Sequence, residues 1–466
     1  MANIPPLALC LTYCYLLLVG ASHNFEAEKR AAAAAAMSDK ITTFVHELGL
    51  PSSTQASELG DKLRGDSNLS AFLSGGNFSH HLLAKLACSS IQKVLGPNSA
   101  VDYDNQTEVD ANCFFQTKFS VRSGGHSPNP GWSSIRKPGI LIDLQKLNKI
   151  AISTDKSVIS LGPGGRWGDF YTALDPYGVS VIGGRLPDVG EAPIIFQGNM
   201  IVLADGTIVD ANAQQNSDLF WALKGGGPNF GIVTRFDLFT IPVHEIWYQV
   251  GAYTVDQIPA VLDAFVKWQE NGASDVKSTV IPIIGLEGVT LVLIYSEPAT
   301  QPAAFAPFYS IPAAVIPVPA QNSTVLGLTT VLASAFSNAP ARHDYCAASS
   351  KIDAQLYKDV YSFWREQVLA VNQDTVWTTV VDWTNVQDDA TVRGVSIATG
   401  QKWQQLGEER GLYVPFLFMN DASRDQDPLS LYGLDNLSKL KAISKKYDPA
   451  QVFKKLQNDG FLLSKA

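Results

Sequence analysis

Hydrophobic residues recur every three or four positions in several long stretches of the chain, as they do on one face of an amphipathic helix. The pattern predicts helices over 79–95, 258–270 and 354–371. It also predicts a shorter helix over 167–174 and a C-terminal helix with an apolar face of Leu434, Leu437, Leu440 and Ile443. The first helix stops at Gly96-Pro97, a pair that terminates helices.

Short runs rich in β-branched residues predict strands between these helices. Asp155-Lys156 and Asp205-Gly206 each separate two such runs, which predicts two β-hairpins. The run Ile232-Val233-Thr234 also predicts a strand. Beyond about Thr240 the strands lengthen, as at 280–284 and 289–295. This shift in pattern marks a second part of the chain.

The composition narrows the class of protein. With 466 residues, 46% of them hydrophobic, the chain can bury a large core, and two or three domains are expected. The net charge is -9, the pI is near 5.3, and there is no basic run. These properties argue against nucleic acid or an anionic membrane surface as partner. We therefore expect a small-molecule substrate.

The N-terminus has the pattern of a secretory signal peptide. Residues 7–19 are almost wholly apolar, too few to span a bilayer, and Gly20-Ala21-Ser22 follows as a cleavage site. We expect a signal peptide over 1–21, a low-complexity linker over 22–59, and a secreted protein. No Lys or Arg precedes the apolar run, so a mistaken start site stays open as an alternative.

Cysteine and asparagine usage agrees with secretion, and no metal is expected. Outside the leader the chain has Cys88, Cys113 and Cys346, an odd number that leaves one unpaired. His244-Glu245 lacks the second histidine of a zinc helix, and no Cys-x-x-Cys pair exists in the sequence. Sequons compatible with a glycoprotein stand at Asn68, Asn77, Asn105 and Asn322.

One glycine-rich stretch has the pattern of a ligand site. A strand-like run leads into Gly124-Gly125 and delivers His126, so that bare backbone lies against a ligand while the imidazole reaches it. Taken alone, this motif is better explained by an ordinary glycine turn with a surface histidine. Further glycine motifs stand at 162–168, 183–184 and 225–227. For these, a tight turn and a helix terminator are the alternatives to ligand contact.

Together these motifs resemble the FAD-linked oxidases of the berberine-bridge-enzyme-like family, over about 82–463. The resemblance rests on four motifs: Arg-Ser-Gly-Gly-His at 122–126, Gly183-Gly184-Arg185, the run from Asp218 to Thr234, and Phe418-Met419-Asn420-Asp421-Ala422. The resemblance implies an α+β fold with a two-part, PCMH-type FAD-binding domain and an antiparallel-sheet substrate domain. We expect the FAD domain over 60–240, the substrate domain over 241–405, and 406–466 completing the FAD domain.

The resemblance also assigns residues to the cofactor. It implies FAD bonded covalently to His126, and further cofactor contacts at Arg122, Ser123, Gly124, Gly125, Ser127, Gly184 and Asn420. Leu186 stands where some relatives carry a second attachment cysteine, so a single tether is expected. The catalytic base of the relatives has no matching residue in this sequence, and Tyr413 and Asp421 are the candidates for this role. A disulfide between Cys88 and Cys113 is implied, with Cys346 free.

Two segments that relatives carry are missing from this sequence, near 102–112 and 190–200. The second should supply much of the loop around the flavin pyrophosphate, and its replacement contains Pro193, which lacks an N–H donor. The FAD domain is therefore predicted to be truncated, and the chain as written to bind FAD poorly.

The function that the resemblance implies is that of a secreted FAD-dependent oxidoreductase. It takes a hydride from an alcohol, a sugar or a secondary metabolite, and oxygen is the expected electron acceptor. The alternative is a degenerate member without catalytic activity. A glycan-binding protein without flavin would need exposed aromatic platforms, and the sequence has no such pattern.

Overall fold

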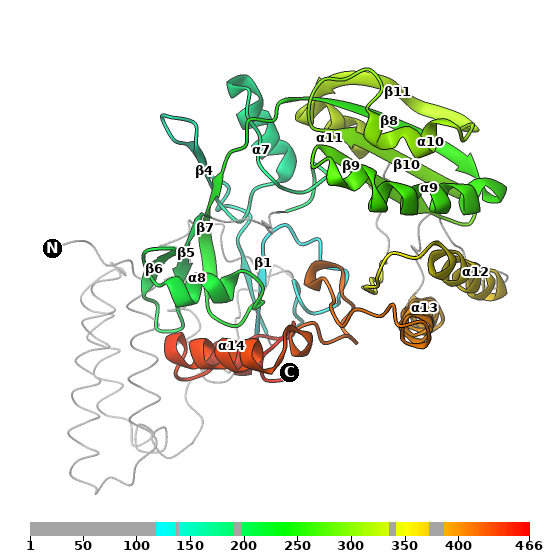
Figure 1. Cartoon of the computed structure of the whole chain (residues 1–466). Coiled ribbons are helices and arrows are strands. Elements are labelled where there is room, and N and C mark those ends of the chain that lie inside the picture. Colours follow the sequence, from blue (N-terminus) through cyan, green and yellow to red (C-terminus); the bar gives the residue numbers. More distant parts are fainter. Residues whose placement is uncertain (1–117, 137–138, 191–196, 335–341, 372–385) are drawn as a thin grey trace, which may run out of the picture.

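The computed structural model describes residues 118–136, 139–190, 197–334, 342–371 and 386–466 (Figure 1). Helices and mostly antiparallel sheets alternate along these residues, so the predicted α+β class is confirmed. The predictions for the leader and linker, the helix over 79–95, the Cys88–Cys113 pairing and the gap near 102–112 lie outside the described residues, as do three of the four sequons.

The first part of the chain forms two sheets. Strands β1 (Phe119–Arg122) and β2 (Ile140–Asp143) pair in parallel. The second sheet is antiparallel, in the order β3 (Ile150–Ile152), β4 (Val158–Leu161), β7 (Ile232–Phe239), β5 (Gly198–Val202) and β6 (Ile208–Asn212). Both predicted hairpins are present within it. Their turns contain Lys156 and Gly206 at φ angles of 61° and 82°.

Short helices pack on this sheet, and the hydrophobic core lies between the helices and the sheet. Helix α7 (Trp167–Leu174) has the bounds predicted, and it buries Trp167 and Phe170 against β4. Helix α8 (Ser217–Leu223) packs with α14 (Leu434–Tyr447) through the predicted residues Leu437, Leu440 and Ile443. The fourth predicted residue of this face, Leu434, is the first residue of α14 and is 82% exposed, so that part of the prediction is wrong. Because α14 belongs to the C-terminal segment, the end of the chain completes this core (Figure 1).

The C-terminal segment also reaches β1. Gln457 forms a parallel bridge with Phe119, and the Asn458 amide donates to the Phe119 carbonyl at 2.6 Å. Helix α15 (Val452–Leu456) places Phe453 edge-on to Phe119, with ring centroids 5.8 Å apart. The buried Asp448 carboxylate accepts the first amides of this helix, from Val452 and Phe453, each at 2.9 Å. The strand that leads to His126 is thus held by residues more than 300 positions later.

The second part is the predicted antiparallel sheet. Its strand order is β11 (Val315–Thr324), β8 (Glu245–Thr254), β10 (Gly288–Tyr295) and β9 (Ser278–Ile284). Helices α9 (Ile258–Glu270) and α10 (Ala306–Tyr309) pack on one face, around Trp247 and Leu291. Helix α11 (Val325–Ala333) packs on the other face and also contacts α7 of the first part.

Two long helices extend this part beyond the sheet. Helix α12 (Ala354–Val371) has the bounds predicted, and it packs against α13 (Asp389–Glu409) through Leu356, Val360 and Leu406. Short 3-10 helices occupy Asp175–Tyr177, Val255–Gln257, Gly272–Ser274, Ala303–Phe305, Val386–Asp388, Met419–Asp421 and Ser430–Tyr432. Across the described residues, no helix combines the length and apolar character needed to cross a membrane.

Candidate functional site

The loop after β1 exposes His126. Gly125 has a φ of 72°, a conformation that side chains rarely adopt, so the glycine is required for this turn. The His126 side chain is exposed, and no hydrogen-bond or ion-pair partner for it exists among the described residues. Ser127 accepts a hydrogen bond from the Asn129 amide at 3.3 Å, which shapes the next turn. The imidazole is therefore free to bond to a ligand.

Gly124 contacts a second glycine loop. A Cβ atom on Gly124 would lie 2.3 Å from the Cα atom of Gly190, so only two glycines permit this approach. The Arg166 guanidinium donates to the Gly124 carbonyl at 3.0 Å and also to the Asp188 carbonyl. These contacts fix the His126 loop against the segment that ends at Gly190.

Two other predicted cofactor residues are engaged within the protein. The Arg122 guanidinium pairs with the Asp143 carboxylate and so links β1 to β2, with Nε 3.1 Å from Oδ2. The Ser123 hydroxyl donates to the Pro163 carbonyl in the neighbouring glycine loop. Both side chains thus hold the loop in place. A contact with a cofactor would be a second role for each.

Gly184 makes room for an indole ring. A Cβ atom there would lie 2.3 Å from Trp167, and the Tyr171 hydroxyl donates to the Gly184 carbonyl at 2.9 Å. Burial raises the pKa of Tyr171, so the phenol stays protonated and keeps donating. Leu186, two residues later, packs on the α11 face of the antiparallel sheet. The 183–190 segment therefore lies between the two parts of the molecule.

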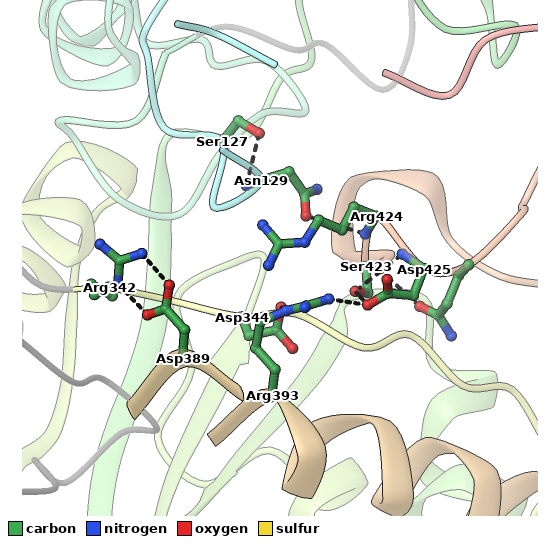
Figure 2. Close-up of polar contacts among 10 residues, drawn as sticks. Ser127, Asn129, Arg342, Asp344, Asp389, Arg393, Ser423, Arg424 and Asp425 are labelled. Carbon is green, nitrogen blue, oxygen red and sulfur yellow. Dashed lines mark hydrogen bonds and ion pairs between the residues drawn. The ribbon is translucent and has the colours of Figure 1, made fainter. Parts of the chain in front are cut away.

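Asn420 lies on a C-terminal loop that is bonded to the His126 loop. The Arg424 amide donates to the Asn129 side-chain oxygen at 3.2 Å, a contact shown in Figure 2. Asn420 and Asp421 are exposed and make no side-chain hydrogen bond within the part of the chain described. The structure thus joins the two loops that carry the predicted flavin contacts. Tyr413 is half-buried, and its backbone pairs with Ser350.

An arginine–aspartate network, which the sequence did not reveal, lies next to this junction (Figure 2). Arg393 of α13 donates to Asp344 at 3.3 Å and also pairs with Asp425 on the Asn420 loop. Nearby, Arg342 pairs with Asp389 at the start of α13. Because these pairs join residues 32 to 49 positions apart, no local pattern marks them. The cluster of acidic residues between 421 and 427 was the one available signal.

Asp344 is the most buried member of this network. Its side chain is 4% exposed, and its Oδ2 atom has no hydrogen-bond partner in the described structure. Burial raises the pKa of Asp344, while Ser396, Arg393 and Arg424 act to lower it. The Gln426 side chain docks the same two segments together, since its oxygen accepts from Ala347 N at 2.9 Å and its amide donates to Ala347 O at 2.7 Å.

The glycines at 225–227 have a structural role. Gly226 N donates to Ala222 O at 2.8 Å at the end of α8, the helix-terminator alternative. The Asn229 side chain, fully buried, donates to Gly226 O and to Phe461 O and accepts from Leu463 N at 2.9 Å. This motif thus fastens the C-terminal tail. The sequence hypothesis of main-chain contact with a ligand gains no support from these bonds.

Comparison with known proteins identifies the family. A family model described as "FAD binding domain" matches residues 104–190. An FAD-dependent monooxygenase of Arthrobotrys oligospora is 38% identical over 398 residues, covering 74% of this chain and 78% of the relative. The chain belongs to this family of FAD-linked oxidoreductases. The bifunctional solanapyrone synthase of Alternaria solani is 30% identical, with 76% of this chain and 78% of that protein covered.

Solved structures share the fold of this FAD-linked oxidoreductase. The BBE-like 1 protein of Physcomitrella patens has a TM-score of 0.59 at 19% identity, covering 74% of this chain and 86% of its own. The glucooligosaccharide oxidase of Acremonium strictum, whose FAD is described as 6-S-cysteinyl and 8α-N1-histidyl, has a TM-score of 0.56 at 18% identity, covering 74% and 87%. The predicted berberine-bridge-like, two-domain fold is confirmed.

The residues of this FAD-linked oxidoreductase fit the ring end of FAD. His126 is exposed and has no partner within the described ranges, and Asn420 lies on the loop bonded to its loop. Arg122, Ser123, Gly124 and Gly184 support these loops through contacts of their own. The replacement segment over 191–196, on the predicted pyrophosphate side, lies outside the described residues. Among the described residues, no group of His, Cys, Asp and Glu is placed to hold a metal ion.

Proposed function

We propose that this oxidoreductase oxidises a small organic molecule by accepting a hydride onto FAD that is tethered through His126 alone. One observation supports the proposal: an exposed imidazole, with no partner in the part of the chain that the structure describes, stands on a loop bonded to the loop of Asn420. FAD supplies the hydride acceptor and passes the electrons to oxygen. The protein supplies the tether, the orientation of the ring and a base for the substrate proton.

The base is proposed from the two sequence candidates. Asp421 is exposed and adjoins Asn420, whereas the Tyr413 backbone is engaged with Ser350, nearer the helices of the substrate domain. We favour Asp421 on this placement. In the flavin-loaded protein, Asp421→Asn should lower kcat by about 10²-fold or more, the size of a general-base contribution, while Tyr413→Phe should not. The reverse order of effects makes Tyr413 the base.

The substrate is proposed to be a secondary metabolite rather than a sugar. The relatives at 30% identity or more include a solanapyrone synthase, while the carbohydrate oxidases resemble this chain at 17–21% identity, in fold alone. Secretion is proposed from the leader over 1–21, and a glycan at Asn322 would accompany it. A panel of alcohols, phenols and oligosaccharides, scored by anaerobic bleaching of the flavin, tests the substrate class.

Attachment is tested by acid precipitation. Yellow colour should stay with the denatured wild-type protein and be released from His126→Ala. His244→Ala, which removes a histidine that pairs with Asp175 and has no predicted cofactor contact, is the matched control and should retain the colour. If His126→Ala retains its flavin after denaturation, the tether lies elsewhere. If neither protein carries flavin, the outcome points to the second candidate function.

That second candidate is a family member that binds FAD poorly because two segments are missing. The alignment with the Arthrobotrys relative has 398 positions and covers 74% of the 466 residues of this chain. That share contains fewer residues than the alignment has positions. The relative therefore has residues in the aligned region with no counterpart here. A pyrophosphate needs several main-chain N–H donors, and the segment 191–196 contains a proline and four apolar residues.

The test compares two secreted versions of the chain, this sequence and one with family-length segments restored at both gaps. The flavin-to-protein ratio is read from absorbance in the visible flavin band. We expect low occupancy in the first version and near-full occupancy in the second. Near-full occupancy and turnover in the unrestored chain contradict this candidate and leave the oxidase proposal in place.

A further inference from the structure

A pocket of about 530 Å³ opens beside the substrate-domain sheet. Its walls are formed by β9, α9, α12 and α13 and by the extended segment 348–350. This volume lies within the range of small-molecule sites, roughly 300–1,000 Å³. None of the lining residues is charged.

The pocket has an aromatic wall. The ring centroids of Phe265 and Tyr357 lie 6.2 Å apart, and those of Tyr357 and Trp403 lie 6.0 Å apart. Tyr361 and Trp364 form a second aromatic pair in the lining, also at 6.0 Å. Rings at these separations present flat faces and edges that favour another planar ring.

The opposite wall offers hydroxyl groups. Ser349 and Ser350 line the pocket, and no hydrogen-bond partner for either hydroxyl exists among the described residues. Among the other lining hydroxyls, that of Thr399 donates to Val395 O within its own helix at 2.8 Å, and that of Tyr357 donates to Gln269. The two serines therefore remain available to a polar group of a ligand. An ion would lose its hydration here without gaining a charged partner, so a neutral ligand is favoured.

Fixed contacts keep the pocket open. Lys358 of α12 pairs with Asp263 of α9 at 2.6 Å, and the Tyr357 hydroxyl donates to Gln269 of α9 at 3.3 Å. These two contacts fix the spacing of α9 and α12.

The pocket is separate from the flavin site. Successive residues of a strand point to opposite faces of the sheet. Pro282 and Ile284 line the pocket on the α9 face, whereas Ile281 packs on the α11 face with Leu186 of the 183–190 segment. The sheet therefore stands between the pocket and the loop that adjoins His126, and a molecule in the pocket cannot reach the reacting position.

We propose that this pocket is a second, non-catalytic binding site for a neutral, planar aromatic molecule that carries a hydroxyl or carbonyl group. The aromatic wall stacks on the ring system of the ligand, and Ser349 and Ser350 bond its polar group. The segment that bears these serines continues into Asp344–Ala347, which the Arg393 and Gln426 contacts join to the Asn420 loop.

The probe is 2-naphthol, titrated calorimetrically into the full-length protein as purified, whether or not it carries flavin. The anion 2-naphthoate and the non-aromatic cyclohexanol are compared with it. We expect one saturable site for 2-naphthol with a Kd of about 100 µM or below, a modest value for a small ligand. The two comparison compounds should bind at least tenfold more weakly, and the flavin absorbance should not change.

Two variants locate the site. Thr399→Phe fills the pocket and should raise the Kd for 2-naphthol at least tenfold, while Val276→Phe, at a side chain 91% exposed and outside the pocket, should not. Ser350→Ala should raise the Kd about fivefold, the effect of one hydrogen bond, and serves as the test if Thr399→Phe does not fold. An unchanged Kd in the folded variants overturns the proposal. So does the absence of saturable binding to the wild-type protein, or a 2-naphthol signal that perturbs the flavin.

Discussion

Replacing Arg393 with methionine should destabilise the protein by leaving the Asp344 carboxylate buried without its partner. The Asp344 side chain is 4% exposed and that of Arg393 is 19% exposed. Breaking a fully buried pair typically costs about 3–5 kcal/mol. Because the guanidinium is partly exposed, we expect about 2–3 kcal/mol, with little added by Asp425, which is 46% exposed. That loss corresponds to a melting temperature lower by about 2–3 °C for a chain of this size.

The pH dependence identifies the cause. Burial already raises the pKa of Asp344 from 3.8, so the folded state holds this proton more tightly than the unfolded state. Stability from this group is therefore present at low pH and is lost as the pH rises through the folded pKa. Removing Arg393 raises that pKa further. The difference in melting temperature between wild type and Arg393→Met should thus be small near pH 4 and grow towards pH 7.

Two matched variants complete the experiment. Asp344→Asn combined with Arg393→Met removes the buried charge and should recover more than half of the loss. Arg410→Met breaks the pair between Arg410 and Asp359, which are 31% and 34% exposed, and should cost less than about 1 kcal/mol. The reasoning is refuted if Arg393→Met and Arg410→Met have the same melting temperature at every pH. It is also refuted if the double variant is no more stable than Arg393→Met.

Three further substitutions test other contacts by thermal melting. Asn229→Ala leaves the groups of Gly226, Phe461 and Leu463 unpaired in a buried site and should cost about 2–4 kcal/mol, whereas a loss below 1 kcal/mol would show that water replaces the side chain. Gly124→Ala drives a Cβ atom to 2.3 Å from the Gly190 backbone and should lower both stability and flavin attachment, and a wild-type melting curve would contradict this. In Gly394→Ala, inside α13, the new Cβ atom has no neighbour within 4 Å, so the variant should be more stable by about 0.5–1 kcal/mol. A lower stability would contradict this reasoning.

The helices of this chain were predictable because their causes are local. The bounds of α7, α9 and α12 agree with the sequence prediction, since each has an apolar face of helical period. Both hairpins were predictable for the same reason, since Asp155-Lys156 and Asp205-Gly206 specify tight turns.

The contacts that support the site were not predictable. The glycine pair Gly124 and Gly190 is separated by 66 positions, and neither residue signals the other. The same holds for Asp344, Arg393 and Asp425, which meet only after both parts of the molecule have folded. Resemblance to a family supplied His126 and Asn420 as candidates, but not the Asn129 bond that joins their loops.

The Asn229 contacts have a consequence for the order of events during synthesis. The core of the first part includes Phe461 and Leu463, and Asn229 bonds the backbone of both. A ribosome must therefore translate more than 230 further codons, including the whole substrate domain, before the FAD domain can close. During that interval, the apolar faces of α8 and its sheet are open to chaperones or to aggregation. Flavin attachment, which requires a positioned ring, should therefore follow the synthesis of residues 461–463. A premature stop codon even shortly before codon 461 should yield a protein without flavin.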